Sequence, residues 1–316
     1  MRYGYGDVRF ARLYGWLPHL TPDTQHPTPN TQHPMPKLPP TSLVLLAIAS
    51  AQLGSAIAKS LFQSLDPTGV VVLRLGFAAI TLMLLWRPQI KASFRAHYRP
   101  LILFGLALAF MNISFYQAIA RIPLGIAVTL EFIGPLGVAI ANSRKWLDAV
   151  WVLLAAAGII LLAPIGEQAF DPVGIALALV SGGFWAAYIL LSARVGQVLA
   201  GGTGLALSMA IGAMVLFPVG VATSGAALLN PHVLLVGFGV ALLSSAIPYS
   251  LELEALRSLP VQVFGVLLSL EPAAGALMGF LVLRETLNLR AMIALLFVTI
   301  AAAGASKFAS RKEPVP

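Results

Sequence analysis

The sequence predicts an all-α polytopic membrane protein, with ten transmembrane helices arranged as two inverted five-helix repeats around a central cavity. Three observations predict this class. Of the 316 residues, 58% are hydrophobic and only 10% are charged, whereas a soluble domain has about a quarter of its residues charged. Apolar segments near the ~20 residues that cross a bilayer recur along the chain. The second half also repeats the first half 137 positions later.

Ten apolar segments follow one another. They are continuous rather than alternating in polarity, which favours helices over membrane strands. Charged residues, Pro or Gly bound each one. The segments are 41–62, 66–86, 99–119, 123–142, 147–164, 171–192, 202–222, 231–250, 260–282 and 289–308.

The internal repeat gives these segments a topology. Gln117-Ala118-Ile119, Ile122, Pro123 and Pro135 return as Glu254-Ala255-Leu256, Leu259, Pro260 and Pro272. Each copy holds five segments, an odd number, so the second copy enters the membrane upside down. Inverted repeats of this kind are typical of carriers that open alternately to the two sides.

The two ends of the chain differ from the apolar body. Residues 1–40 form an extension that includes a Pro-, Thr- and Gln-rich tandem heptad at Thr21–Pro34. Such a segment cannot bury a core and is expected to be disordered. Met35 follows directly, and we hypothesise that it is the biological start. The predicted organisation is the extension, a first repeat over 41–166, a second over 167–309, and a cytoplasmic tail over 310–316.

Basic residues in the loops predict the orientation, because the cytoplasmic side carries the excess of Lys and Arg. With a cytoplasmic N-terminus, twelve basic residues face inside, which places both termini in the cytoplasm. They are Lys37, Arg87, Lys91, Arg95, Arg99, Arg144, Lys145, Arg194, Arg257, Lys307, Arg311 and Lys312. The outer side has only Arg121, Arg284 and Arg290, with Lys59 near that surface.

Composition excludes several function classes. The absence of cysteine rules out thiolate metal or redox chemistry, and the five histidines form no metal motif. We therefore expect no metal and no cofactor. The net charge of +8 resides in loops, without a phosphate-binding loop or an RNA signature, so nucleic acid is not an expected partner. An intramembrane aspartyl protease needs close carboxylates on a motif such as GxGD, which no apolar segment contains.

Two glutamates are candidate substrate-binding or proton-coupling residues. Glu131 and Glu271 lie within apolar segments, between the prolines of each repeat. A carboxylate at that depth is costly and is often functional. One or both glutamates can contact a substrate amine or carry a coupling proton; alternatively, each caps a broken helix. Pro135 and Pro272 predict kinks beside them.

Arg74 is the third charge within an apolar segment. Its guanidinium can bind a substrate carboxylate, or it can neutralise Glu131 or Glu271 in a permanent ion pair. Lys59 lies near the outer end of its segment, where it can extend to the interface.

Polar residues at helical spacing mark helix faces that avoid lipid. Each such face either lines a hydrated cavity or forms a hydrogen-bonded seam between helices. Together with the buried charges, they favour a cavity among segments one, three, six and eight. The residues are Gln52, Ser55 and Lys59; Asn112 and Tyr116; Ser181, Trp185, Tyr188 and Ser192; and Ser245, Tyr249 and Glu252.

Three stretches resemble a known family. Pro123–Ile140, Ser244–Pro260 and Phe264–Gly279 are similar to the bacterial threonine/homoserine exporters of the EamA branch of the drug/metabolite transporter superfamily. The resemblance extends over about residues 41–309. It implies an inner-membrane exporter of small amino acids that exchanges them for protons, with Glu131 and Glu271 in matching family segments.

The predicted function is therefore secondary export of a threonine- or homoserine-like amino acid by proton-coupled alternating access. A zwitterion suits the residues, since a glutamate can bind the ammonium and Arg74 the carboxylate. The alternative within transport is a sugar phosphate or nucleotide sugar, which needs more basic groups than Arg74 and Lys59. A membrane scaffold or sensor is a third class, but it needs neither inverted symmetry nor central charges. The oligomeric state is open.

Overall fold

The computed structural model describes residues 38–88, 90–141, 147–162, 170–199, 201–256, 258–259 and 261–308. Within these ranges every regular element is helical, in agreement with the predicted all-α class. The residues from Pro39 onward form one compact unit. Most of the N-terminal extension with Met35, the C-terminal tail, and the basic residues Arg144, Lys145 and Arg257 lie outside the described residues.

Seven helical segments of the described chain are long and apolar enough to cross a membrane, and three apolar helical segments are shorter. These segments correspond in order to the ten predicted ones, while ten crossings remain a prediction. The first three are α2 (Pro40–Ser60) with η1 (Leu61–Gln63), α3 (Pro67–Trp86) and α4 (Ile90–Ile119). The next four are α8 (Pro172–Val198), α9 (Thr203–Ser224) with η2 (Gly225–Leu229), the continuous α10 (Pro231–Ala241), η3 (Leu242–Ala246) and α11 (Ile247–Leu256), and α12 (Val261–Leu268) with α13 (Glu271–Leu283). The shorter ones are α5 (Leu124–Glu131) with α6 (Ile133–Ala141), α7 (Leu147–Leu161) and α14 (Leu289–Phe308).

Three helices begin with the same local signal, an Asp or Asn followed by Pro. Asp66 accepts a hydrogen bond from the Thr68 backbone N–H at 2.8 Å, and Asp171 accepts one from Val173 at the same distance. Asn230 caps α10 in the same way. The side-chain oxygen satisfies an N–H that has no helical partner, while proline fits the first helical position without needing one.

The sequence predicts kinks beside the two glutamates, and the structure interrupts both helices there. Phe132 separates α5 from α6, and Ser269 and Leu270 separate α12 from α13. Two irregularities were not predicted. The segment η3 is a π-helical turn between α10 and α11, and α4 contains a non-helical residue at His97, shortly before Pro100. Such irregular turns change the direction of a helix and place backbone groups where side chains can reach them.

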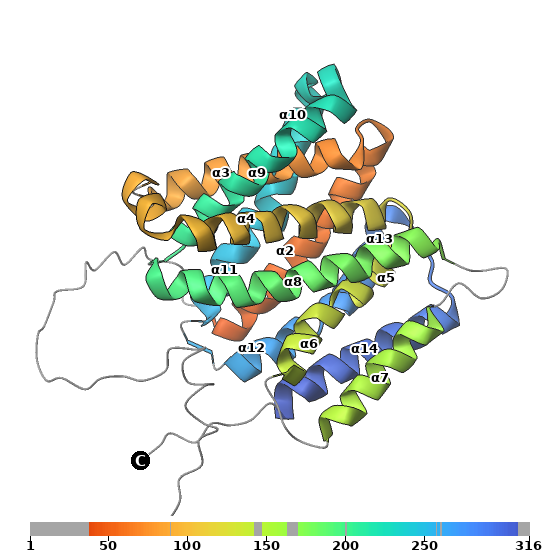
Figure 1. Ribbon diagram of the computed structural model, residues 1–316. Coiled ribbons are helices and arrows are strands. Elements are labelled where there is room, and N and C mark those ends of the chain that lie inside the picture. The colour runs from red at the N-terminus through yellow and green to blue at the C-terminus, as the bar shows by residue number, and fades with distance from the viewer. Residues whose placement is uncertain are drawn as a thin grey trace, which may run out of the picture. The chain divides into compact units, whose positions relative to one another are not determined.

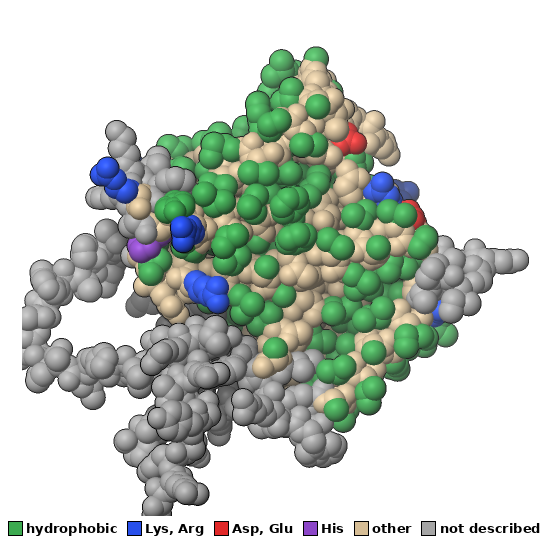
Figure 2. Space-filling model, viewed as in Figure 1, with side chains coloured by type: hydrophobic (Ala, Val, Ile, Leu, Met, Phe, Trp, Pro, Cys, Tyr) green, Lys and Arg blue, Asp and Glu red, His purple; other side chains and the backbone are tan. Residues whose placement is uncertain are grey.

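The surface of the described helices suits lipid. Large apolar side chains point outward from several helices, among them Leu84, Leu153, Leu229 and Leu235, each about 70% exposed. Figure 2 shows apolar side chains across most of the visible face, with Lys and Arg gathered toward its margins. Because a soluble protein rarely exposes so much contiguous apolar surface, this surface fits a polytopic membrane protein.

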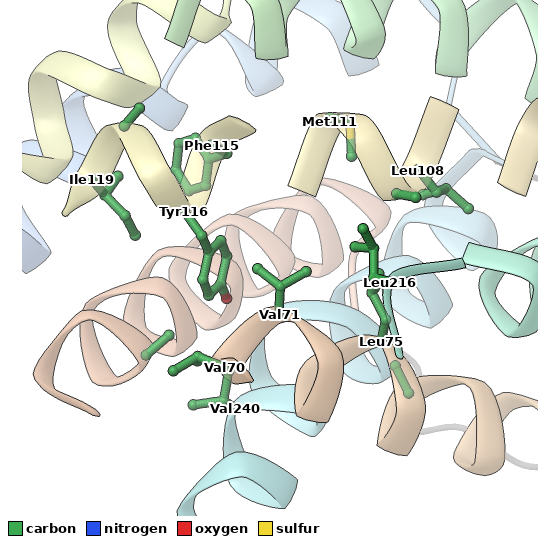
Figure 3. Packing of buried hydrophobic residues seen from close by; sticks show 14 of the residues in the cluster. Val70, Val71, Leu75, Leu108, Met111, Phe115, Tyr116, Ile119, Leu216 and Val240 are labelled. Carbon is green, nitrogen blue, oxygen red and sulfur yellow. The ribbon is translucent and has the colours of Figure 1, made fainter. Parts of the chain in front are cut away.

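Helices from the two halves of the chain pack directly against each other. The helix α4 lies along α8 and α9, α3 packs on α9 and α10, and α2 packs on η3, α11 and α13. In Figure 1, α7 and α14 lie side by side, away from α3 and α9. Buried side chains of α3 and α4 meet near the middle of the bundle, where Tyr116 points from α4 toward Val70 and Val71 (Figure 3). The candidate residues lie on α2, α3, α4, α5, α8, η3, α11 and α13.

Candidate functional site

Arg74 is buried in α3 and is held by the π-helical turn η3. Its Nε donates to Ser245 Oγ at 3.0 Å, and its Nη2 donates to the Ser244 carbonyl at 2.9 Å. The wide π turn presents a carbonyl and a hydroxyl side by side, which fits the planar fork of an arginine. These hydrogen bonds use two of the three guanidinium nitrogens.

The ring of Tyr116 contributes to the same environment. The Arg74 Cζ lies 5.3 Å from the centre of this ring, a cation–π contact. The ion pairs of the described residues join Lys59 to Glu285 and Arg121 to Asp171, so Arg74 is in no ion pair with Glu131 or Glu271. The permanent ion pair considered from the sequence is therefore not formed; a carbonyl, a hydroxyl and an aromatic face surround the cation instead.

Glu131 is the last residue of α5 and is 9% exposed. Its Oε1 lies 2.5 Å from Ser181 Oγ on α8, and the same hydroxyl lies 2.9 Å from the Met111 carbonyl on α4. A serine has a single O–H proton. Two acceptors therefore compete for one donor, unless Glu131 itself carries a proton and donates it to Ser181.

Two glycines allow the close approach of α8 to the break after Glu131. A Cβ on Gly182 would lie 2.6 Å from the Glu131 carbonyl oxygen, and a Cβ on Gly134 would collide with the Gly182 backbone. Neither position has room for a side chain. The backbones of α5, α6 and α8 thus touch directly, and this contact sets the Glu131–Ser181 distance.

Glu271 is the first residue of α13 and is 8% exposed. The positive end of a helix stabilises a negative charge at this position. Its carboxylate makes no hydrogen bond or ion pair within the described residues, but it interacts electrostatically with Glu252 and Glu131. Because the helix is interrupted just before Glu271, Ser269 and Glu271 are both buried. A regular helix would point them in different directions.

Aromatic rings connect the two polar helix faces predicted from segments six and eight. Tyr188 on α8 stacks on Tyr249 of α11, with 6.3 Å between ring centres, and also contacts Phe104 at 5.3 Å. Trp185 meets Phe132 edge-on at 5.5 Å, next to Glu131. The polar face of α8 therefore turns toward both the break in the α5–α6 segment and α11.

The structure brings most of the predicted residues into one central cluster. From Arg74 the contacts run to Ser245, one helical turn along to Tyr249, across to Tyr188 on α8, and along α8 to Ser181 and Glu131. Arg74 and Glu131 also interact electrostatically. The central cluster thus consists of Arg74, Ser245, Tyr249, Tyr188, Ser181 and Glu131, together with Glu271, which interacts electrostatically with Glu131.

Two predicted cavity residues have a different environment. Asn112 donates its amide N–H to the Leu108 carbonyl of its own helix at 2.8 Å. Gln52 lies on α2, 3.2 Å from the position a Cβ would take on Gly275 of α13, and its Oε1 is buried without a hydrogen-bond partner in the described chain. The Asn112 side chain therefore bonds within α4, and the Gln52 side chain lies between α2 and α13.

Two residues of the predicted polar faces gain partners that the sequence did not indicate. Glu252 lies one turn after Tyr249 and interacts electrostatically with Tyr188, Tyr249 and Glu271. Lys59, predicted to extend to the interface, binds Glu285 Oε1 through its Nζ at 2.5 Å. No pattern in the sequence connects Lys59 with a residue 226 positions away.

Comparison with known proteins shows the family of this chain. Residues 172–307 match the EamA-like transporter family. The chain is 41% identical over 283 residues to the threonine/homoserine exporter RhtA of Salmonella typhimurium strain LT2, covering 88% of this chain and 95% of the relative. It is 42% identical over 276 residues to RhtA of Escherichia coli strain K12, covering 87% and 93%. The chain belongs to the EamA-like transporter family.

A protein of known crystal structure shares the fold. It superposes with a TM-score of 0.61 at 16% identity and covers 85% of this chain and 98% of its own. Membership in the EamA-like family makes this chain a multi-pass membrane transporter rather than an enzyme. Within the described residues, no group of three His, Cys, Asp or Glu side chains is placed to hold a metal ion.

Proposed function

We propose that this chain exports small amino acids of the threonine and homoserine type across the bacterial inner membrane by proton-coupled alternating access. The observation that carries the proposal is the 41–42% identity to two curated threonine/homoserine exporters along almost their whole length. The buried central cluster supports it, because a membrane protein retains buried charges at a cost and such groups commonly mark a transport pathway.

The zwitterionic form of the substrate suits the cluster. We assign the Arg74 guanidinium to the substrate carboxylate through Nη1, the nitrogen not used in the bonds to Ser244 and Ser245. Glu131 and Glu271 are assigned to the ammonium and the coupling proton. The Tyr188–Tyr249 pair and Trp185 supply apolar faces with polar edges for a small side chain.

The helix pairings support two inverted five-helix repeats. If the spans are numbered in chain order, span three packs on spans six and seven, and span eight packs on spans one and two. If each span of the first half is exchanged with the corresponding span of the second half, the first set of pairs becomes the second set. The pairs two with seven, four with nine and five with ten map onto themselves, and each occurs. Such exchange symmetry is what two conformations of similar energy require.

The Ser181 hydroxyl offers a mechanism for proton coupling. With Glu131 ionised, Ser181 donates to the carboxylate. With Glu131 protonated, the carboxyl donates to Ser181 Oγ and the hydroxyl donates to the Met111 carbonyl, so Glu131 and Ser181 keep a partner in both states. A substrate ammonium that requires the ionised form then binds only after the proton leaves.

Counterflow in proteoliposomes tests the proposal. Vesicles loaded with unlabelled threonine or homoserine should accumulate the labelled amino acid, while protein-free vesicles and vesicles loaded with glucose 6-phosphate should not. Failure with a panel of amino acids and success with a sugar phosphate would reverse the assignment.

Two variants then isolate the proton step. Glu131→Gln keeps an oxygen that can accept from Ser181 but cannot titrate, so counterflow should persist while a proton gradient no longer drives export. Ser181→Ala keeps the acid, so export should still depend on the gradient, but at a lower rate because the hydrogen bond to Glu131 is lost. Full gradient dependence in Glu131→Gln would remove Glu131 from the coupling step.

A further inference from the structure

The carboxylate of Glu285 joins the two halves of the chain. Its Oε1 lies 2.5 Å from Lys59 Nζ at the end of α2, and its Oε2 accepts a hydrogen bond from the Leu124 backbone N–H at 2.8 Å. Lys59 Nζ also donates to the Ile122 carbonyl at 2.9 Å. One side chain of the second half therefore binds the end of α2 and the first residue of α5, both in the first half.

The backbone holds Glu285 in place for these contacts. The helix α13 ends with Arg284 in the left-handed region at φ 57°, and the Glu285 N–H donates to the Gly279 carbonyl at 3.0 Å. This is a Schellman end, which fixes the residue that follows the helix. Gly279 leaves room for the carboxylate, since a Cβ there would lie 2.7 Å from Glu285 Oε2.

These contacts connect directly to the central cluster. Leu124 begins α5, which ends at Glu131, and Glu285 follows α13, which begins at Glu271. The two helices pack against each other. Glu285 thus lies at the ends of two short helices that each have a buried glutamate at the other end.

The Lys59–Glu285 ion pair is more buried than the Arg121–Asp171 pair. The Lys59 and Glu285 side chains are 19% and 16% exposed, whereas Arg121 and Asp171, 3.8 Å apart, are 37% and 38% exposed. Both pairs lie at the end of the bundle that the basic loop residues predict to face outside, here called the outer end. An exposed pair contributes little, while a charged pair that is partly buried and has further hydrogen bonds is held more firmly.

We propose that Lys59, Glu285 and the first turn of α5 form the outer gate of the transport path, closed in this structure and opened when substrate leaves. This inference rests on the proposed function, because the gate is a part of the proposed alternating-access cycle. With the gate closed, the central cluster is sealed from the outer end. Opening must break the Glu285 contacts and separate α13 from α2 and α5.

Cysteine labelling tests the gate without any substrate. The chain has no cysteine, so Ser55→Cys introduces a single thiol. Ser55 is buried and lies one turn before Lys59 on the same face of α2. Spheroplasts carrying this variant are treated with a membrane-impermeant maleimide. We expect slow labelling with the native pair, and about tenfold faster labelling with Glu285→Gln, the change that one hydrogen bond to a charged group is worth.

The exposed pair at the same end provides the matched control. Arg121→Gln should label as slowly as the parent Ser55→Cys protein, because its ion pair is solvent-exposed. Lys59→Met is a second gate variant, useful if Glu285→Gln folds poorly, and it should also label faster. Labelling of both gate variants at the Arg121→Gln rate would overturn the gate. A wild-type protein that fails to transport any amino acid would instead contradict the proposed function and leave the labelling result intact.

Discussion

Replacing Gly182 by Ala tests the packing that positions Glu131. A Cβ at residue 182 would lie 2.6 Å from the Glu131 carbonyl oxygen, and ordinary contact begins at 3.4 Å. The backbones of α8 and α5 must then separate by roughly 0.8 Å, a strain that costs about 1–3 kcal/mol in a packed interior. Because Ser181 precedes Gly182 on α8, its hydroxyl moves away from the Glu131 carboxylate as well.

This displacement has a functional consequence. The Ser181–Glu131 contact, now 2.5 Å, would lengthen toward the limit of a hydrogen bond, and a hydrogen bond to a charged group contributes about 1.5–3 kcal/mol. We expect gradient-driven threonine export to fall by about tenfold or more, since a tenfold change corresponds to about 1.4 kcal/mol. Thermal unfolding of the purified protein in detergent should show a lower midpoint.

The next residue offers a matched control. A Cβ on Gly183 meets nothing within 4 Å, so Gly183→Ala should leave export unchanged and stabilise the helix by up to about 1 kcal/mol. The two variants add the same methyl group to adjacent positions of α8. Equal export and equal unfolding midpoints for the two would refute the claim that backbone contact at Gly182 positions Glu131.

Two further variants test how Arg74 is held. Arg74→Lys should lose threonine counterflow almost as completely as Arg74→Gln, because an ammonium cannot reproduce the planar arrangement that binds Ser245 Oγ and the Ser244 carbonyl together. Counterflow by Arg74→Lys within twofold of wild type would argue against this role. Gly54→Ala places a Cβ 2.7 Å from the Ser244 backbone nitrogen and should lower both the unfolding midpoint and the substrate affinity. The control Gly76→Ala on α3 has nothing within 4 Å of its Cβ and should lower neither. Similar midpoints and affinities for the two variants would contradict the reasoning.

Part of the site could be predicted from helical periodicity. Ser181, Trp185 and Tyr188 recur at the spacing of one helix face, as do Ser245 and Tyr249, and the structure turns these faces toward each other. Periodicity identifies a face because side chains three and four positions apart are neighbours on a helix. Prolines near the glutamates likewise predicted the interruptions of α5–α6 and α12–α13, since proline removes a backbone donor.

Other features depend on tertiary contacts that leave no local pattern. Pro248 follows the π turn at Leu242–Ala246 and has no N–H to donate to the Ser244 carbonyl. Only the structure shows that Arg74 binds this carbonyl and Ser245. The role of Gly182 depends on the Glu131 backbone approaching from another helix. Glycines are frequent in membrane helices, so the sequence alone does not distinguish Gly182 from Gly183.

The central claim is that one buried cluster binds both charges of an amino acid, and competition for threonine counterflow tests it most directly. Threoninol keeps the ammonium and lacks the carboxylate, while 2,3-dihydroxybutyrate keeps the carboxylate and lacks the ammonium. We predict that unlabelled threonine and homoserine compete fully and that each single-charge compound competes at least tenfold more weakly, since each leaves one buried group of the site unpaired. Equal competition by both single-charge compounds and threonine would contradict the account.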